Sequence, residues 1–436
     1  MKKIIILFVS ILIVNCSKES EPTMYTLTVT SNPTEGGTIS PSGGEYEDGT
    51  DVTIRVTPNT NYEFDRWSGS GSGTESQLTI TMDGNKSLVG NFILSDLDID
   101  GVTDNIDTCP NTPSGESVNS TGCSSSQTDT DGDGVNDNID QDNNTRSGVP
   151  VDENGVMSNP IYLDDNGITI KSQEWGIIGD VGEIDGVEYT IGDRSYIETW
   201  LSEDRNLNQL CTTLITSMEY GFSNGIPSDF NGDISNWDVS NVTNMYGLFI
   251  NSDFNGDISN WDVSSVTSMG RMFDRSQFNG DISNWDVSSV TDMYGMFTES
   301  QFNQDISNWD VSNVIYMDSM FYGSQFNQDL NSWDVSSVYN MGYMFRQSQF
   351  NGDISNWDVT GVDNMSDMFS YSQFNQDIST WDVSNVLNMS LMFSYSNQFN
   401  QDLSNWDVSN VINCSSFSFD SPQYTLPKPN FTNCTP

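Results

Sequence analysis

A tryptophan recurs every 24 residues through the C-terminal half of the chain, and this period constrains the fold more than any other feature. Each unit is a variant of FNGDISNWDVSNVTNMYGLFINSD, and the last unit is degenerate. A period in this range is typical of a solenoid, in which every coil is one small supersecondary unit. The tryptophans are Trp237, Trp261, Trp285, Trp309, Trp333, Trp357 and Trp381, then Trp406 after a one-residue insertion at Asn397.

Large apolar residues also recur at fixed places within each unit. One coil cannot bury them alone, so we expect stacked coils to share a continuous core. The alternation in DISNWDVS predicts a short strand, and the spacing in MxxMF predicts a helical turn. The predicted fold is a leucine-rich-repeat-like solenoid with one short strand and one helical turn per coil. In one unit the apolar positions are Phe254, Ile258, Trp261, Val263, Val266, Met269, Met272 and Phe273.

Two columns of aspartates run through the repeats, one from Asp233 to Asp402 and one from Asp238 to Asp407. We expect these carboxylates to accept hydrogen bonds from turn amides, as aspartate does in Asx-turns. An asparagine column that begins at Asn231 is predicted to stack as an amide ladder. The alternative for the aspartates is that the paired columns bind Ca²⁺ along the coils.

The overall charge and the absence of histidine exclude several classes of function. The chain has 14 Lys and Arg against 62 Asp and Glu, a net charge of −48 that repels phosphate backbones. Nucleic acid is therefore not an expected partner. With no histidine, the commonest general base and every His-containing metal site are missing. We predict that the chain is not an enzyme, although a carboxylate-based glycan hydrolase is compatible with this composition.

The N-terminal residues predict an export signal. MKKIIILFVSILIVNC places two lysines before an apolar run (residues 4–14) that is too short to span a bilayer. Its end on Cys16 resembles the lipobox of bacterial lipoproteins, although Asn15 replaces the usual small residue. The resemblance implies a signal peptide over 1–15, lipidation of Cys16, a polar tether over 16–23 and anchoring in the outer membrane on the extracellular side. The alternative is a plain secretory signal in which Cys16 is not modified.

Residues 24–93 alternate in short runs such as YTLTVT and DVTIRVTP, separated by glycine-rich turns. This pattern predicts a small antiparallel β-domain. The stretch GGTISPSGGEYEDGTDVTIRVTPNTNYEFDRWSG resembles the internalin-type B-repeat of bacterial surface proteins. The resemblance implies that Trp67 and Phe92 lie in the core. We interpret the domain as a spacer between the anchor and the repeats; the alternative is that it carries a ligand site.

Residues 94–158 are rich in aspartate and poor in large apolar residues. We therefore expect that they cannot form a hydrophobic core unaided. Two units, DLDIDGVTDNID and DTDGDGVNDNID, align at an offset of 33. Alternating aspartates around a glycine turn suit Ca²⁺, which takes six to eight oxygen ligands. The pattern resembles thrombospondin type 3 repeats. The predicted ligands are Asp96, Asp98, Asp100, Asp104 and Asp107, and Asp129, Asp131, Asp133, Asp137 and Asp140.

The two units also predict a disulfide. Cys109 and Cys123 of the first unit align with Asp142 and Val156 of the second, so the two cysteines are absent together. Residues that are absent as a pair are expected to act as a pair, and we predict a Cys109–Cys123 bond in an oxidising compartment.

The repeats from Phe230 to Val411 match the FNxDISxWDVSxVTxMxxMF pattern of the BspA-like surface lipoproteins. This resemblance implies a solenoid over 230–412, an N-terminal cap over 159–229 and a C-terminal cap over 413–436. Caps are needed because an open coil end exposes the core. Two cysteines flank the end, and we expect a Cys414–Cys434 disulfide. Cys211 is then an unpaired buried thiol.

Function is predicted from the positions that vary between coils. Tyr and Arg occur there repeatedly, and these side chains often anchor interfaces. The alternative is that they are exposed residues of a solvated face without a binding role. We predict an adhesin-like protein that binds an extracellular protein or glycan; the alternatives are a structural envelope or biofilm component, and the hydrolase. The predicted ligand-binding residues are Tyr246, Arg271, Tyr294, Tyr322, Tyr343, Arg346 and Tyr371.

Overall fold

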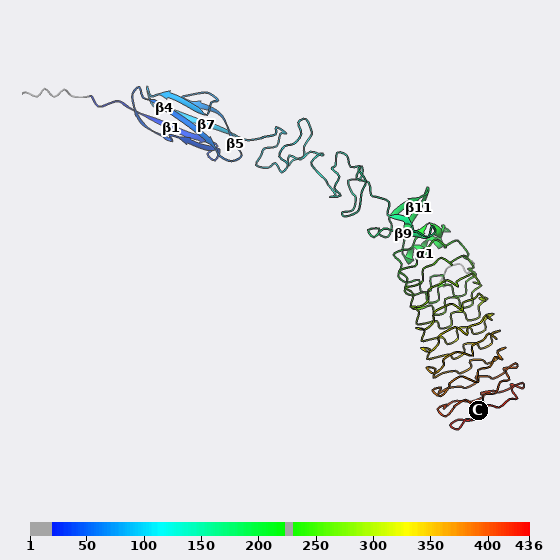
Figure 1. Cartoon of the computed structure of the whole chain (residues 1–436). Coiled ribbons are helices and arrows are strands. Elements are labelled where there is room, and N and C mark those ends of the chain that lie inside the picture. Colours follow the sequence, from blue (N-terminus) through cyan, green and yellow to red (C-terminus); the bar gives the residue numbers. More distant parts are fainter. Residues whose placement is uncertain (1–19, 223–229) are drawn as a thin grey trace, which may run out of the picture. The chain divides into compact units, whose positions relative to one another are not determined.

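The computed structural model describes residues 20–222 and 230–436, so the predicted signal peptide and Cys16 lie outside the described residues (Figure 1). The chain divides into two compact units, one ending at Met157 and one beginning at Ser158. No helix in the described residues is long and apolar enough to cross a membrane.

The first unit begins with a β-domain of seven strands in two sheets. One sheet has the order β3-β1-β7-β5 and the other β2-β4-β6. β1 and β7 pair in parallel, and the other neighbours are antiparallel. The strands are β1 (Met24–Asn32), β2 (Gly37–Ser40), β3 (Gly43–Glu47), β4 (Asp51–Pro58), β5 (Tyr62–Gly69), β6 (Gln77–Thr81) and β7 (Lys86–Leu94).

Trp67 and Phe92 lie in the core of this domain, as predicted, with exposed fractions of 2% and 4%. The Trp67 indole N–H donates to the Glu75 carbonyl at 2.9 Å, which satisfies the buried donor. A Cβ atom on Gly36 or Gly37 would lie 2.6 or 2.4 Å from the Phe92 side chain. Glycine at these two positions therefore lets the backbone approach the ring.

The Asp-rich segment that follows is built from turns, and its two units repeat the same contacts. The Thr112 hydroxyl donates to the Gly122 carbonyl at 2.8 Å, and Thr145 donates to Gly155 at 2.9 Å, an offset of 33 in both partners. The Cys109–Cys123 disulfide is present, with the two Cα atoms 5.0 Å apart. The disulfide prediction is confirmed.

The second unit opens with a mixed cap in front of the first repeat. β8 pairs with β9, and a second sheet has the order β10-β11-β12. Helix α1 begins after Asp193, whose carboxylate accepts hydrogen bonds from two backbone N–H groups of the first turn, and it buries Ile197 and Trp200. Cys211 is buried and free, as predicted. The elements are β8 (Ile161–Leu163), β9 (Ile170–Ser172), β10 (Val181–Ile184), β11 (Val187–Ile191), α1 (Arg194–Ser202), the 3₁₀ helix η1 (Leu207–Gln209) and β12 (Leu210–Cys211).

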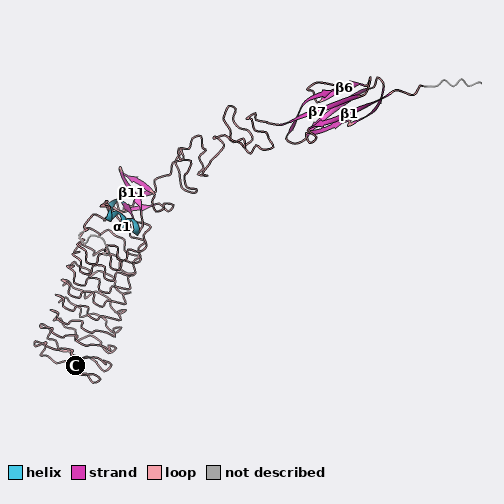
Figure 2. Cartoon of the chain, turned by 180° about the vertical axis from the view of Figure 1, so that it is seen from behind, coloured by secondary structure: helices cyan, strands magenta, loops and turns pink. Residues whose placement is uncertain are grey.

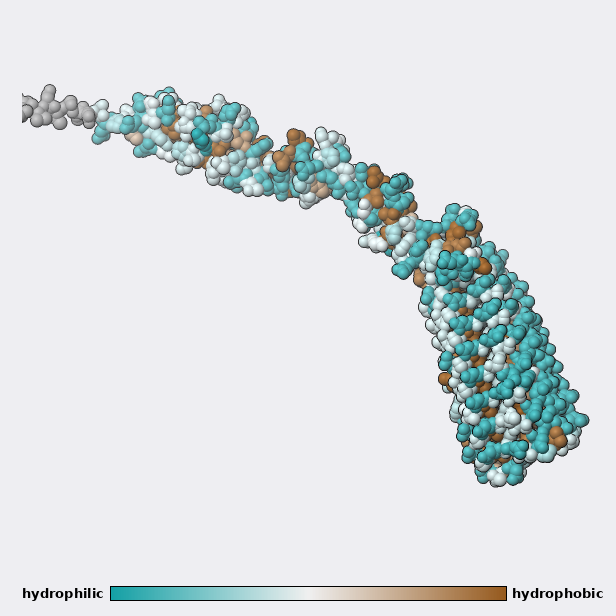
Figure 3. Space-filling view, viewed as in Figure 1, coloured by the Kyte–Doolittle hydropathy of each residue, from teal (hydrophilic) through white to brown (hydrophobic). Residues whose placement is uncertain are grey.

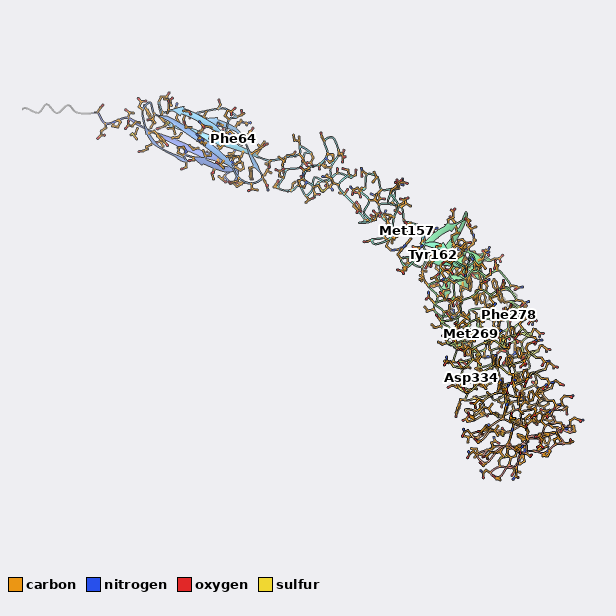
Figure 4. All side chains as sticks on the ribbon, viewed as in Figure 1. Phe64, Met157, Tyr162, Met269, Phe278 and Asp334 are labelled. Carbon is orange, nitrogen blue, oxygen red and sulfur yellow. A yellow bond between two sulfur atoms is a disulfide. The ribbon has the colours of Figure 1, made fainter. Side chains whose placement is uncertain are left out.

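The 24-residue repeats stack on one another around one cluster of buried side chains, as the period predicts. Two of its members, Met269 and Phe278, are labelled in Figure 4, and both are fully buried. One phenylalanine column, which includes Phe278, has successive ring centroids 6.1 to 6.3 Å apart. A second, which includes Phe273, has them 5.5 to 5.7 Å apart. These separations suit offset stacking of aromatic rings.

Each repeat tryptophan also ties its coil to the preceding one. The Trp309 indole N–H donates to the Ile282 carbonyl at 3.0 Å. The same bond recurs at the equivalent position of every coil from Trp261 to Trp406, at 2.8 to 3.1 Å, and Trp237 donates to the Leu207 carbonyl of η1 in the cap at 3.0 Å. A buried donor is thus satisfied only when the neighbouring coil is in place.

The predicted strand and helical turn within each coil are wrong. Within residues 230–412, all of which the structure describes, the chain forms turns and single bridging residues only (Figure 2). The DISNWDVS segment is not a strand because Asp257 and Asp262 each accept the backbone N–H two residues later, which bends the chain twice. The parallel bridge lies elsewhere, at the residue before the first methionine, as between Ser268 and Asp292.

The MxxMF segment is not helical because its N–H groups alternate between two acceptors. Those of Met269 and Arg271 donate to carbonyls of the next coil, at 2.9 and 2.7 Å, while that of Met272 closes a local turn on Met269. Arg271 and Arg275 adopt positive φ angles of 53° and 54°, which this alternation requires. Each segment therefore forms a ladder with its neighbour.

The C-terminal residues cover the last coil. The backbone N–H of Leu403 donates to the Pro427 carbonyl at 3.0 Å, and the Phe431 ring packs edge-on against Phe417. Cys414 and Cys434 form the predicted disulfide, with a Cα separation of 5.8 Å.

Candidate functional site

The first candidate site is the pair of aspartate loops. Asp96, Asp98 and Asp100 each place a carboxylate oxygen within 4.8 Å of the other two, and the equivalent residues of the second loop do the same. Oxygens on opposite sides of one Ca²⁺ ion, each at about 2.3–2.6 Å from it, lie about 5 Å apart. The described residues contain acidic groups of this kind only in the two loops. The second group is Asp129, Asp131 and Asp133.

Several carboxylate oxygens in these loops are buried without a hydrogen-bond partner among the described residues. In the first loop Thr112 N–H donates to Asp98 Oδ2 at 2.7 Å, which leaves Oδ1 without a donor, and Val102 N–H occupies only one oxygen of Asp100. The unpartnered atoms are Asp98 Oδ1, Asp100 Oδ2, Asp133 Oδ2 and Asp140 Oδ2. Buried carboxylate oxygens without donors are suited to a cation.

Of the remaining predicted ligands of the first loop, Asp107 lies close to another carboxylate, whereas Asp104 is occupied by hydrogen bonds. A Cβ on Gly122 would lie 2.0 Å from Asp107 Oδ1 and 3.3 Å from Asp100 Oδ2, so these two carboxylates converge. Asp104 instead accepts hydrogen bonds on both oxygens, from the Ser95 hydroxyl and the Leu97 N–H, and these bonds lower its pKa. Asp137 is held in the same way by Thr128 and Thr130. Asp104 and Asp137 therefore fasten the start of each loop.

Like charges gather closely enough in the second loop to affect titration. A hydrogen bond from Val135 lowers the pKa of Asp133, but burial and the neighbouring charges of Asp131, Asp140 and Asp129 together raise it. A bound cation would relieve this repulsion.

The second candidate site lies on the turn face, which we define as the outward side chains of the MxxMF segments. The segments bury their methionines and phenylalanines, whereas several residues between and after them, among them Tyr294, Tyr343 and Arg275, are exposed. The visible face of the repeats is mostly hydrophilic in Figure 3. On the turn face lies a pocket of about 380 Å³, within the range of small-molecule sites. We call it the turn-face pocket.

The turn-face pocket brings together five of the seven predicted ligand-binding residues. The other two lie beside it: Tyr246 interacts with Arg271, and Tyr371 lies next to the guanidinium of Arg346. The five that line the pocket are Arg271, Tyr294, Tyr322, Tyr343 and Arg346.

Sequence reasoning missed Asp274, which lines the same pocket and is 1% exposed. Its Oδ2 accepts a hydrogen bond from Arg271 Nε at 2.7 Å, and its Oδ1 lies 4.0 Å from Arg275 Nε. The sequence did contain a sign of this residue: Asp274 lies between Arg271 and Arg275. The equivalent residues of the next two coils, Thr298 and Tyr322, are not acidic.

The other two arginines of the pocket are also paired with acids. Arg275 Nε lies 2.6 Å from Glu299 Oε2, and Arg346 Nη1 lies 3.5 Å from Asp367 Oδ1. The Arg346 guanidinium carbon is also 5.5 Å from the Tyr343 ring centroid, within cation–π range. Arginine thus holds the tyrosine rings in place through charge as well as packing.

The aspartate columns of the repeats act as turn acceptors, as expected. Asp286 Oδ1 accepts the Ser288 hydroxyl and backbone N–H at 2.6 and 3.0 Å, and these bonds lower the pKa of Asp286. The asparagine column forms a ladder, but through the backbone: the Asn279 N–H donates to Asn255 Oδ1 at 2.8 Å.

Comparison with known families bears on both halves of the chain. A family model described as "Mycoplasma protein of unknown function, DUF285" matches residues 195–299, 251–349 and 324–427. A model of the divergent InlB B-repeat domain matches residues 27–95, which confirms the B-repeat resemblance. No curated protein and no solved structure gave a significant match.

Asp318, beside the turn-face pocket, yields a pH-dependent prediction. Burial raises its pKa to about 6, and the charge of Asp292 adds to this. Because the folded-state pKa is raised, the protonated form favours folding, and this contribution is lost as pH rises through 6. One pKa unit corresponds to about 1.4 kcal/mol of folding free energy. Because the carboxyl is only partly buried and solvent screens it, we take the whole contribution of Asp318 to be about 1 kcal/mol. Asp318→Asn should therefore stabilise the protein by about that amount at pH 8.

Denaturant titrations at pH 8 and pH 4 test this. The stabilisation should vanish at pH 4, where the parent carboxyl is protonated in the folded state. Asp305→Asn is the matched control with the opposite sign, because hydrogen bonds from Ser307 lower the pKa of Asp305. Equal effects of Asp318→Asn at both pH values would contradict the assignment.

Proposed function

The chain belongs to the family described as "Mycoplasma protein of unknown function, DUF285", and we propose that it is a lipid-anchored surface protein that binds a macromolecular ligand as an adhesin. One observation carries the proposal. Residues 230–412 contain three cationic side chains, Arg271, Arg275 and Arg346, and all three line the turn-face pocket. In a chain of net charge −48, such a concentration at one place distinguishes it from the rest of the repeats.

The repeat organisation supports binding over a long surface. We interpret the stacked coils as a solenoid in which core and backbone ladder are the same in each coil while the turn face differs. Three tyrosine rings, those of Tyr322, Tyr343 and Tyr371, lie within 6.0 Å of the Arg346 guanidinium carbon. Tyrosine and arginine are the residues that most often dominate interface energetics. An extracellular protein or glycan that spans several coils fits this surface.

A structural role in the envelope or a biofilm is the second candidate. The uniform stack of coils favours it, but such a role does not require a cluster of tyrosine and arginine confined to a few coils. Within the described repeats, the aspartates of the two columns serve each coil alike as turn acceptors. We therefore propose a binding protein and not an enzyme.

We also propose that the aspartate loops bind Ca²⁺. Asp96, Asp98, Asp100 and Asp107 would hold one ion, and the corresponding residues of the second loop the other. The support is the set of buried carboxylate oxygens without donors. Bound calcium would stiffen a segment that contains few large apolar side chains. The second set is Asp129, Asp131, Asp133 and Asp140.

The binding proposal predicts that combined substitutions on the turn face abolish ligand binding. Residues 17–436 would be applied to an array of extracellular-matrix proteins and glycans. Replacing Tyr294, Tyr322 and Tyr343 together by alanine should weaken binding at least tenfold, because central aromatic anchors supply most of the binding energy. Tyr339→Ala is the matched control, since this tyrosine is 53% exposed and does not line the pocket. Specific binding that the triple variant retains would refute the proposed face.

Calcium binding is tested by calorimetric titration of the same protein with CaCl₂. The parent should take up two ions at up to about 1 mM, the range of extracellular calcium modules, and become resistant to proteolysis between the β-domain and the cap. Asp98→Asn combined with Asp131→Asn should abolish both effects, and Asp83→Asn outside the loops should leave them unchanged. Absence of heat and of protection in the parent would rule out the calcium sites.

The anchor is tested in cells. Cys16→Ser removes the thiol that would carry the lipid, so the variant should leave the membrane fraction for the soluble fraction. A variant that stays as firmly in the membrane fraction as the parent would disprove the lipid anchor. Protease treatment of intact cells then tests whether the anchored parent faces outward.

A further inference from the structure

We propose that the turn-face pocket is a subsite for an uncharged saccharide. This inference rests on the proposed binding function and specifies the chemistry of the ligand. It is carried by an unmatched hydrogen-bond donor and an unmatched acceptor in the same pocket, beside tyrosine rings.

The unmatched acceptor belongs to Asp274 and the unmatched donor to Arg346. Asp274 Oδ1 and Arg346 Nε are both buried and have no hydrogen-bond partner among the described residues. Both side chains line the turn-face pocket. Leaving such groups unpaired costs about 1–3 kcal/mol each, and more for charged groups. A ligand that supplies both a donor and an acceptor would recover this cost.

Hydroxyl groups meet this requirement because each can donate and accept. A carboxylate, sulfate or phosphate ligand could accept from Arg346 but would face Asp274 with like charge. An ammonium ligand could donate to Asp274 but would face the arginines. Adjacent hydroxyl groups on a sugar ring serve both partners without adding charge.

The arginines of the pocket are already neutralised, which further disfavours an anionic ligand. Arg271 is paired with Asp274, and the other two with Glu299 and Asp367. Asp367 is only 3% exposed, so an anion could not readily displace it from Arg346. The chain's net charge of −48 also repels anions at a distance.

The tyrosines supply apolar surface for the C–H faces of a sugar ring. Tyr294 and Tyr343 line the pocket and are 38% and 39% exposed. Tyrosine combines a rigid ring with a polar tip, so it can pack against a sugar and hydrogen-bond to it. Further along the stack the Tyr371 and Tyr395 rings lie 4.4 Å apart, which continues the aromatic surface toward further sugar units.

The test uses residues 17–436 and saturation-transfer NMR with defined probes. The uncharged probes are maltotriose, cellotriose, mannotriose and N-acetylchitotriose, and the acidic probes are sialyllactose and a sulfated lactose. At least one uncharged probe should bind, and Arg346→Gln and Tyr322→Ala should each weaken it at least tenfold. Tyr339→Ala should leave binding unchanged. Arg346→Lys keeps the charge but loses the planar donor set, so it should also weaken binding.

Each outcome decides between distinct conclusions. Circular dichroism first establishes that the variants are folded. If only acidic probes or matrix proteins bind, and the pocket variants lose them, the saccharide inference is overturned while the proposed function stands. If no ligand's binding responds to the pocket variants, both are overturned. Release of reducing sugar from a bound probe would identify catalysis instead of binding and would also overturn the inference.

Discussion

The hydrogen bond from each buried tryptophan to the preceding coil is the interaction on which the rest of the structure depends. The indole N–H of Trp309 is buried with its ring, and its acceptor is the carbonyl of Ile282 in the coil before. A buried donor without an acceptor is costly, so the tryptophan can be buried only if the previous coil is already in register. The same bond in every coil explains why the 24-residue period is kept so closely, and the stacked phenylalanine columns add packing along the same direction.

This dependence between coils leaves outward positions free to vary, and those of the turn face are among them. The core positions are fixed by packing, and the two aspartates of each unit are fixed by the turns that they close. At the outward positions of the MxxMF segments, the backbone is held by the ladder and the side chain is not. The three arginines of the repeats lie there with Tyr294, Tyr322 and Tyr343, around one pocket. A rigid stack thereby presents a varied surface, which is the arrangement that a binding protein needs.

Much of this architecture could be predicted from the sequence because the large apolar residues of the core recur at fixed positions of the 24-residue repeat. The burial of Trp67 and Phe92 was implied by the B-repeat resemblance, and it is observed. The Cys109–Cys123 disulfide was predicted from comparison of the two Asp-rich units and the Cys414–Cys434 disulfide from its place after the last repeat, and both are present. The path of the chain within a coil was not. DISNWDVS alternates like a strand, but the aspartate side chains capture the backbone N–H groups that a strand would need. Asp274 was missed for a related reason: its burial depends on neighbouring coils, which no local pattern reveals.

The most direct test of this account is the free energy of unfolding of Trp309→Phe. Phenylalanine keeps an aromatic ring in the column but removes the indole N–H, so the Ile282 carbonyl loses its bond to the next coil. The account predicts a loss of about 1–3 kcal/mol, the cost of an unsatisfied buried polar group, measured by denaturant titration against Tyr316→Phe, an exposed tyrosine in the same coil. Equal stability of Trp309→Phe and the parent would contradict the claim that these bonds hold the coils in register.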